Sequence, residues 1–169
     1  CVACEPIRVD VNTFAPRRTQ RRILRRGAES VRVEIGPPVV DAARVQLYNQ
    51  HKRQRGLAAG DATMDADGFR AFLVDTCCET FEMRYWVGDH LLGVAVVDRG
   101  AESLSAVYFF FDPQFQRLSP GVFSILQQIE LCRRWNLRYL YLGLHIARCP
   151  SMVYKAGFYP HERLVDGQW

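Results

Sequence analysis

The segment from Ser103 to Lys155 constrains the fold of this chain more than any other part. It contains the apolar run SAVYFFFDP, then GVFSILQQIELCRRW with apolar residues at helical spacing, then the apolar run YLYLG, and finally CPSMVYK. This order predicts a strand, a helix packed on the sheet, a parallel neighbouring strand and a short helix, because a crossover helix joins parallel strands. Three consecutive Phe residues, 109–111, would fill both faces of the first strand, which we therefore expect to be central.

Patterns on both sides of this segment predict the remaining elements. Apolar runs at 80–87, 91–97 and 104–111 are separated by short turns, which is typical of an antiparallel meander. We expect further strands at 7–11, 31–35, 139–142 and 158–165, and helices after Pro16, at 42–55, after Asp65 or Asp67, at 121–135 and at 151–156. The predicted fold class is α+β, with a mixed, largely antiparallel sheet and flanking helices.

Positive charge is concentrated in one short segment. Six arginines lie within ten residues: Arg17, Arg18, Arg21, Arg22, Arg25 and Arg26. The net charge of the chain is +4, but without these six arginines its 18 acidic residues outnumber the remaining 16 basic ones. On a helix these side chains cover about half the circumference, and Ile23 and Leu24 fall on the other side. Guanidinium groups pair bidentately with phosphate oxygens, so we predict a nucleic-acid partner. The alternative is a solvated basic face.

Length and composition limit the class of protein. A chain of 169 residues with 49% hydrophobic residues can bury the core of one globular domain. No apolar run approaches the roughly 20 residues that cross a bilayer, and the opening CVACEPIRVD lacks the pattern of a secretory signal. We therefore predict a cytoplasmic protein that has no membrane partner and keeps its cysteines reduced.

Cys1 and Cys4 form a CxxC pair, which is half of many metal sites. Two hypotheses remain open. The pair contributes to a zinc site or an iron–sulfur cluster that other residues complete, or it consists of two free thiols.

The order of meander, helix, strand, short helix and strand resembles the GCN5-related N-acetyltransferase fold. Enzymes with that fold bind the pyrophosphate of coenzyme A at the N-terminus of the central helix, in a loop rich in glycine amides. Here the corresponding residues are Arg117 to Val122, and Pro120 removes one amide donor from this loop. The sequence therefore argues against coenzyme A as the acyl donor.

Longer motifs resemble the aminoacyl-tRNA:protein transferases, meaning the arginyl-tRNA:protein transferases and the bacterial leucyltransferases specific for N-terminal Asp or Glu. The resemblance covers most of the chain, in CVACEPIRVDVNTF, RRTQRRILRR, SAVYFFFDP, FSILQQIELCRRW, YLYLG and CPSMVYKAGFYPHERL. It implies transfer of Leu or Arg from aminoacyl-tRNA to proteins with an acidic first residue, which is N-degron tagging. It also implies a monomer that requires no cofactor, with 1–38 ending the family's N-terminal region and 39–169 forming the catalytic domain.

This reaction needs a proton acceptor, donors that face an oxyanion, and a cation for the acceptor's carboxylate. The catalytic candidates are Asp112 as base or amine ligand, Tyr141 as oxyanion donor, and Gln128 on the central helix. The substrate-binding candidates are Tyr154, as a second oxyanion donor, Lys155, for a tRNA phosphate or the acceptor's carboxylate, and Arg84 and Arg117 as alternatives for that carboxylate. Each residue also has an ordinary structural reading, as a turn former, a core aromatic or a surface charge.

Three alternative functions are compatible with the sequence. The first is a coenzyme A dependent N-acetyltransferase, and the second is an aminoacyl-tRNA dependent transferase with a different acceptor. The third is an RNA-binding module without catalytic activity.

Overall fold

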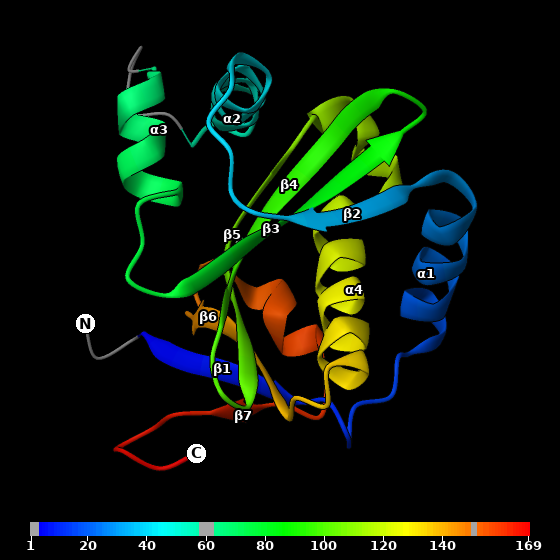
Figure 1. Ribbon diagram of the computed structural model, residues 1–169. Coiled ribbons are helices and arrows are strands. Elements are labelled where there is room, and N and C mark those ends of the chain that lie inside the picture. Colours follow the sequence, from blue (N-terminus) through cyan, green and yellow to red (C-terminus); the bar gives the residue numbers. More distant parts are fainter. Residues whose placement is uncertain (1–3, 58–62, 150–151) are drawn as a thin grey trace.

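The computed structural model describes residues 4–57, 63–149 and 152–169 (Figure 1). Its centre is a 7-stranded sheet with the strand order β2-β3-β4-β5-β6-β1-β7. The strands are β1 (Glu5–Asp10), β2 (Arg32–Gly36), β3 (Glu79–Val87), β4 (His90–Arg99), β5 (Ser103–Phe111), β6 (Tyr139–His145) and β7 (Glu162–Arg163). The helices are α1 (Arg18–Ser30), α2 (Ala42–Gln54), α3 (Ala66–Leu73) and α4 (Pro120–Arg134), with 3-10 turns η1 (Pro113–Leu118) and η2 (Val153–Gly157).

Within the described sheet one pair of neighbouring strands, β5 and β6, is parallel, and these two strands separate after a short ladder. β5 pairs with β6 only through Ser103–Ser105 and Tyr139–Tyr141, whereas the other pairings within the described sheet are antiparallel. Beyond this short ladder the two strands diverge, because β5 continues to Phe111 without further pairing to β6. The predicted α+β class, the meander and the parallel crossover are therefore confirmed.

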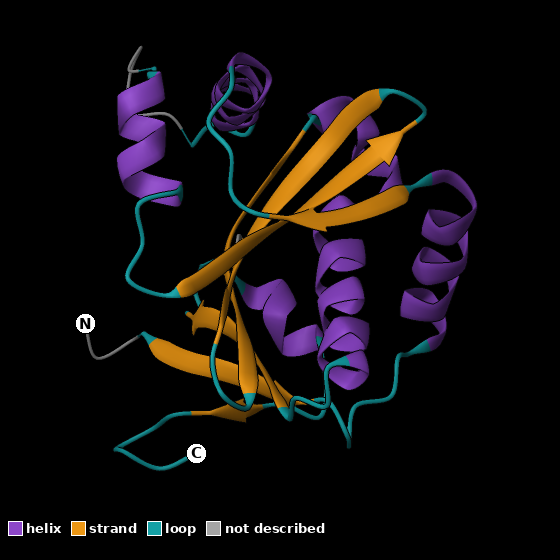
Figure 2. Cartoon of the chain, in the orientation of Figure 1, coloured by secondary structure: helices purple, strands orange, loops and turns teal. Residues whose placement is uncertain are grey.

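Helices cover both faces of the sheet (Figures 1 and 2). α4 lies on one face with α1 beside it, and their core includes Phe111, Phe123 and Ile129. α2 and α3 cover the other face, where Phe110 packs with Leu47 and Phe69. Consecutive Phe side chains of β5 thus enter both cores, as expected for a central strand.

Capping residues in the sequence correctly marked the starts of α2 and α3. The last strand, in contrast, was predicted too long. Asp41 and Asp65 cap α2 and α3 by accepting backbone N–H bonds from Arg44 and Gly68. The strand expected at 158–165 is wrong in extent, since only Glu162–Arg163 pairs with β1. Phe158 instead turns into the core with 1% of its surface exposed, and Pro160 has no N–H to donate to a ladder.

The arginine-rich helix was predicted correctly. The six arginines from Arg17 to Arg26 are all exposed, while Gln20 and Gly27 are buried and Ile23 is half-buried. Gly27 faces Phe123 of α4 so closely that an added Cβ would lie 2.2 Å from its ring. This glycine therefore allows α1 to approach α4, which directs the guanidinium face outward. The proposed boundary at residue 38 stays a prediction; β1 and β2 pair with β6 and β3 in the same sheet.

We expect Gly27→Ala to lower the free energy of unfolding by about 1–3 kcal/mol, because the added methyl overpacks against Phe123. Urea denaturation measures the change. Gly121→Ala is the matched control, since nothing lies within 4 Å of a Cβ at that helical glycine. Equal stability of the two variants would show that α1 moves freely on α4.

Candidate active site

A cavity of about 500 Å³ occupies the place where β5 and β6 diverge. Its walls come from β5, the N-terminus of α4, the C-terminal end of α2 and η2, which are far apart in the sequence. The residues that line this cleft are His51, Arg55, Leu57, Val107, Tyr108, Phe109, Phe111, Gln116, Ser119, Pro120, Gly121, Val122 and Tyr154. Aliphatic and aromatic side chains predominate, and no Asp or Glu is among these residues. The cleft is thus suited to an apolar side chain.

His51 is a buried titratable group that lines the cleft. Its ring is 5% exposed, packs edge-on against Phe111 at 4.8 Å between ring centroids, and places Nδ1 3.0 Å from the Phe111 carbonyl oxygen. Burial lowers the pKa of His51, and the charges of Arg55 and Lys52 lower it further, while the bond to the Phe111 backbone opposes them. The imidazole is therefore neutral at neutral pH.

His51 Nδ1 faces both backbone groups of Phe111, and each neutral tautomer satisfies one of them. The carbonyl oxygen lies 3.0 Å from Nδ1 and accepts from an Nδ1–H, whereas the Phe111 N–H donates at 3.2 Å to an unprotonated Nδ1. In the tautomer with the proton on Nδ1, Nε2 carries the free lone pair. Among the described residues Nε2 has no hydrogen-bond partner, and it is not one of the buried polar atoms left unsatisfied. A neutral imidazole that is a base at Nε2 in this tautomer therefore borders the cleft.

The first turn of α4 supplies backbone donors to the same cleft. Phe123 N–H bonds to Ser119 O, so the amides of Gly121 and Val122 precede the first intrahelical bond of α4. Pro120 occupies the first helical position, where its missing N–H costs nothing. Two amides and the positive end of the helix dipole remain available to an oxyanion.

A second cavity of about 210 Å³ connects the cleft with the arginine-rich helix. It is lined by Arg17, Thr19, Gln20, Ile23, Val122, Tyr154, Gly157 and Phe158, and so shares Val122 and Tyr154 with the cleft. Gln20 Nε2 donates to Gly157 O at 3.2 Å, which fastens α1 to the turn that carries Tyr154. The basic helix and the apolar cleft are therefore neighbouring parts of one surface.

Asp112 lies outside the cleft, in a separate cavity of about 360 Å³. Its carboxylate is 2% exposed and accepts hydrogen bonds from Gln50 Nε2 at 3.0 Å, His90 Nε2 at 3.1 Å and the Gln114 backbone at 3.1 Å. Because Gln50 precedes His51 and Asp112 follows Phe111, these bonds fix α2 to the end of β5. The geometry favours a positioning role for Asp112.

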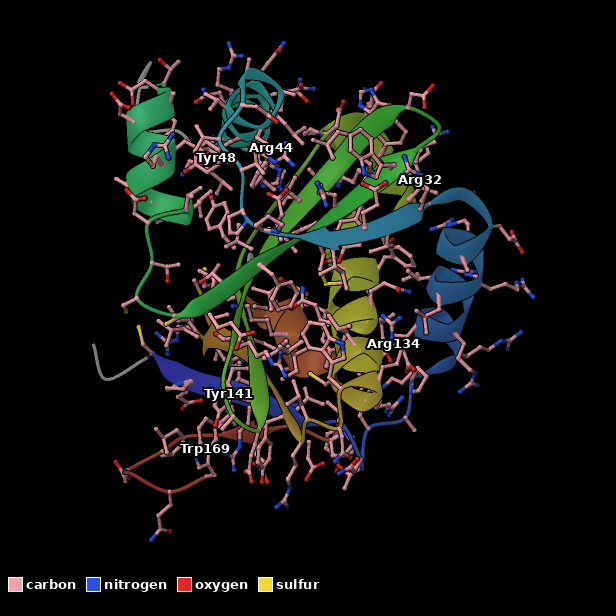
Figure 3. The ribbon with its side chains drawn as sticks, in the orientation of Figure 1. Arg32, Arg44, Tyr48, Arg134, Tyr141 and Trp169 are labelled. Atoms are coloured by element: carbon pink, nitrogen blue, oxygen red, sulfur yellow. The ribbon has the colours of Figure 1, made fainter. Side chains whose placement is uncertain are left out.

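The other two catalytic candidates lie away from the cleft. Tyr141 packs on Trp169 at 5.6 Å between ring centroids, and its hydroxyl accepts from Arg8 at 3.1 Å. Figure 3 shows this pair at the end of the sheet opposite to Arg44 and Tyr48 of α2. Gln128 is 1% exposed in the core and donates to Ser124 Oγ at 3.1 Å. Neither residue lines a described cavity.

Of the four substrate-binding candidates, Tyr154 lines the cleft. Burial raises its pKa, although the charge of Arg55 acts against this, so the hydroxyl stays protonated and can donate. Lys155 Nζ donates to Leu144 O at 2.9 Å, and burial lowers its pKa. Arg84 on β3 lies 3.8 Å from Glu34 and 3.7 Å from Glu82 and is not among the lining residues. Arg117 is exposed in η1 and is not among the lining residues.

The metal hypothesis stays a prediction. Cys1 lies outside the described residues, and Cys4 is a free, partly exposed thiol. In the part of the chain that the structure describes, no three His, Cys, Asp or Glu side chains are grouped as metal ligands. Across the same residues, no helix has the length and apolarity needed to cross a bilayer.

Sequence reasoning missed His51 and Arg55. Both belong to the helix that was predicted at 42–55, and Leu47 and His51 recur at the spacing of one helix face. That spacing indicates that His51 faces the protein interior. It does not indicate that the C-terminal end of this helix lies against β5, beside the cleft.

Comparison with known proteins identifies the family of this chain. The family model described as "Arginine-tRNA-protein transferase, C terminus" matches residues 43–165. The chain is 37% identical over 169 residues to the aspartate/glutamate leucyltransferase of Chromobacterium violaceum, covering all of this chain and 69% of that protein. It is 40% identical over 172 residues to the enzyme of the same name from Thiobacillus denitrificans, covering all of this chain and 70% of that protein.

Solved structures agree on the fold alone. L-PGS from Bacillus licheniformis superposes with a TM-score of 0.64 at 9% identity, covering 85% of this chain and 46% of that chain. FemX superposes with a TM-score of 0.56 at 11% identity, covering 82% of this chain and 52% of that chain. Because the family model matches most of this chain and both relatives match all of it, the chain belongs to the arginine-tRNA-protein transferase family and is an aminoacyltransferase.

Proposed function

We propose that this protein transfers leucine from leucyl-tRNA to the N-terminal amine of proteins that begin with Asp or Glu. The observation that carries the proposal is the apolar cleft that adjoins the exposed arginine face of α1 through Val122 and Tyr154. A tRNA acceptor stem bound along α1 by its phosphates would direct its 3′ end into this cleft. The names of the two leucyltransferase relatives support the same donor and acceptor.

The lining of the cleft favours leucine over arginine as the transferred residue. A buried guanidinium requires a carboxylate partner, and none of the described residues that line the cleft is Asp or Glu. Val107, Phe109 and Phe111 instead offer apolar surface to an aliphatic side chain. The arginyl alternative, which the family model's description suggests, lacks this electrostatic support.

In the proposed reaction, the neutral amine of the acceptor attacks the ester carbonyl carbon of leucyl-tRNA and forms the new C–N bond. The carbonyl electron pair moves onto oxygen, where the Gly121 and Val122 amides and the Tyr154 hydroxyl stabilise the oxyanion. His51 Nε2 accepts the proton from the attacking nitrogen. When the oxyanion collapses, the C–O bond to the terminal ribose breaks, and His51 returns the proton to the ribose oxygen.

The proposal gives structural roles to four residues that the sequence suggested for catalysis or substrate binding. Asp112 positions α2 against β5, and Lys155 stabilises the end of β6. Tyr141 and Gln128 contribute to packing. We also propose the cytoplasm as the compartment, because charged tRNA is available there, and no cofactor is needed for an aminolysis of this kind.

The test of the function is transfer of radiolabelled amino acids from a panel of aminoacyl-tRNAs to peptides that differ only at residue one. We expect transfer from leucyl-tRNA to Asp- and Glu-initiated peptides. Transfer from arginyl-tRNA instead would refute the donor assignment. Binding of tRNA without transfer from any donor would support the RNA-binding alternative, and transfer from acetyl-CoA would support the acetyltransferase alternative.

The donor pocket can be tested by Val107→Asp. Val107 is 45% exposed and lines the cleft, so the new carboxylate would face the leucine side chain. We expect kcat/KM with leucyl-tRNA to fall by about 10- to 100-fold, because apolar contact is replaced by a charge. Val165→Asp is the matched control, since Val165 is 47% exposed and lies outside the cleft. Equal activities of the two variants would place the leucine elsewhere.

A further inference from the structure

Arg55 carries the permanent charge of the cleft, and the reaction steps described above do not use it. It is the C-cap residue of α2, is exposed, and places its guanidinium carbon 5.7 Å from the centroid of the Phe111 ring. No other Arg or Lys is among the described residues that line the cleft.

The charge of Arg55 reaches groups on two walls of the cleft. It lowers the pKa of His51 on α2 and acts in the lowering direction on the pKa of Tyr154 on η2. Arg55, His51 and Tyr154 all line the cleft, so the guanidinium borders the space that the reacting ester and amine would occupy.

Arg55 has no carboxylate partner in the described part of the chain. The ion pairs formed there involve other arginines or histidines, including Arg44 with Glu82 and Arg8 with Glu162. A guanidinium without a carboxylate partner among the described residues, beside a cleft whose described lining has no acidic side chain, attracts an anion from solution.

The other cations considered for an acceptor carboxylate are already engaged or lie elsewhere. Lys155 donates to the Leu144 carbonyl, and Arg84 lies near Glu34 and Glu82. Arg117 is not part of the lining. Arg55 is therefore the cation that an acceptor in the cleft would meet.

We propose that Arg55 binds the side-chain carboxylate of the acceptor's first residue and thereby sets the preference for Asp or Glu; this inference rests on the proposed function. The guanidinium presents two parallel N–H donors to a carboxylate. Because the side chain is long, exposed and placed at a helix end, it can follow a carboxylate that is one methylene nearer or farther. One residue thus accommodates both Asp and Glu.

The experiment is a charge reversal with a matched set of acceptors. Leucyl transfer by the wild-type protein and by Arg55→Glu is measured with peptides that begin with Asp, Glu, Ala or Lys. We expect Arg55→Glu to lower kcat/KM for Asp and Glu relative to Ala by about 30-fold or more, the loss of a charge-assisted pair. We expect the same variant to raise transfer to the Lys peptide relative to Ala.

The Ala peptide is the internal reference, because Arg55 also changes the pKa of His51, and that effect alters transfer to all peptides equally. Arg53→Glu is the control variant, since Arg53 has the same charge, lies near the same end of α2, is exposed and is outside the cleft lining. Unchanged ratios of Asp to Ala in Arg55→Glu overturn the proposal. A uniform loss for all acceptors with weaker tRNA binding also overturns it and assigns Arg55 to a tRNA phosphate.

A binding readout separates this inference from the proposed function. Fluorescence anisotropy measures the affinity of labelled Asp- and Lys-initiated peptides for wild type and for Arg55→Glu without any turnover. If wild type transfers no amino acid, the proposed function fails, while a reversal of peptide preference still supports Arg55 as the carboxylate ligand. No reversal in this assay overturns the inference by itself.

Discussion

Replacing His51 by Ala is expected to lower kcat for leucyl transfer by about 100- to 10,000-fold, the usual contribution of a positioned proton acceptor. The ring is buried beside Phe111, and its neutral form is favoured by burial and by the charge of Arg55. Single-turnover transfer from leucyl-tRNA to an Asp-initiated peptide measures the effect on chemistry, apart from product release.

His51→Asn separates proton transfer from packing. The Asn side chain places a donor near the position of Nδ1, so it can retain the bond to the Phe111 carbonyl while it lacks any equivalent of Nε2. We expect Asn to restore the stability that Ala loses and to leave kcat low, and we expect added imidazole to rescue the Ala variant in part. An active Asn variant would mean that His51 only supports β5.

The pH profile provides an independent test of the same residue. Since the pKa of His51 is lowered from its ordinary 6.5, the neutral form persists to a lower pH, and the limb due to His51 should lie on the acid side of 6.5, below the limb set by the acceptor amine at about 8. Removal of a nearby positive charge by Arg55→Gln should raise this pKa and move the acid limb to higher pH. Tyr154, whose pKa is raised from 10.0, should not limit the rate at neutral pH. If Arg55→Gln left the acid limb of the pH profile unchanged, the assignment of that limb to His51 would be contradicted.

The second large effect is expected from the basic helix. Replacing four exposed arginines of α1 by Gln should lower tRNA affinity by about 100- to 1,000-fold at moderate salt, because each phosphate contact releases counterions: Arg18, Arg21, Arg22 and Arg25. The slope of log K against log salt should fall by about 3 to 4. Filter binding with one tRNA over a salt series measures both quantities.

The control for this variant removes the same number of charges elsewhere. Four exposed arginines from other parts of the chain serve the purpose: Arg53, Arg70, Arg99 and Arg148. We expect a small, uniform loss of affinity, since scattered charges do not follow a phosphate backbone. If both sets of substitutions weaken tRNA binding equally, net charge rather than α1 governs the affinity, and the docking of the acceptor stem along α1 is refuted.

Local patterns in the sequence determined the elements and predicted the chemical class of the partner. Apolar spacing in 103–155 fixed the parallel crossover, since a strand, helix and strand in one sheet have few stable arrangements. The arginine run and its apolar edge predicted a phosphate-binding face, because helical periodicity sorts side chains within one element. Asp41 and Asp65 marked helix starts, as a side-chain oxygen can satisfy a free N–H of the first turn.

Only the tertiary structure decided which side chains share the cleft. His51 and Phe111 are 60 residues apart in the sequence, and they meet because α2 packs against the C-terminal end of β5. Asp112, the next residue along, faces another cavity, and Tyr141 packs with Arg8 and Trp169. Periodicity tells which face of an element turns inward, whereas contacts between distant elements depend on how whole faces fit together. The strand, helix and strand of residues 103–155 were therefore readable from the sequence, and the residues that complete their cleft were not.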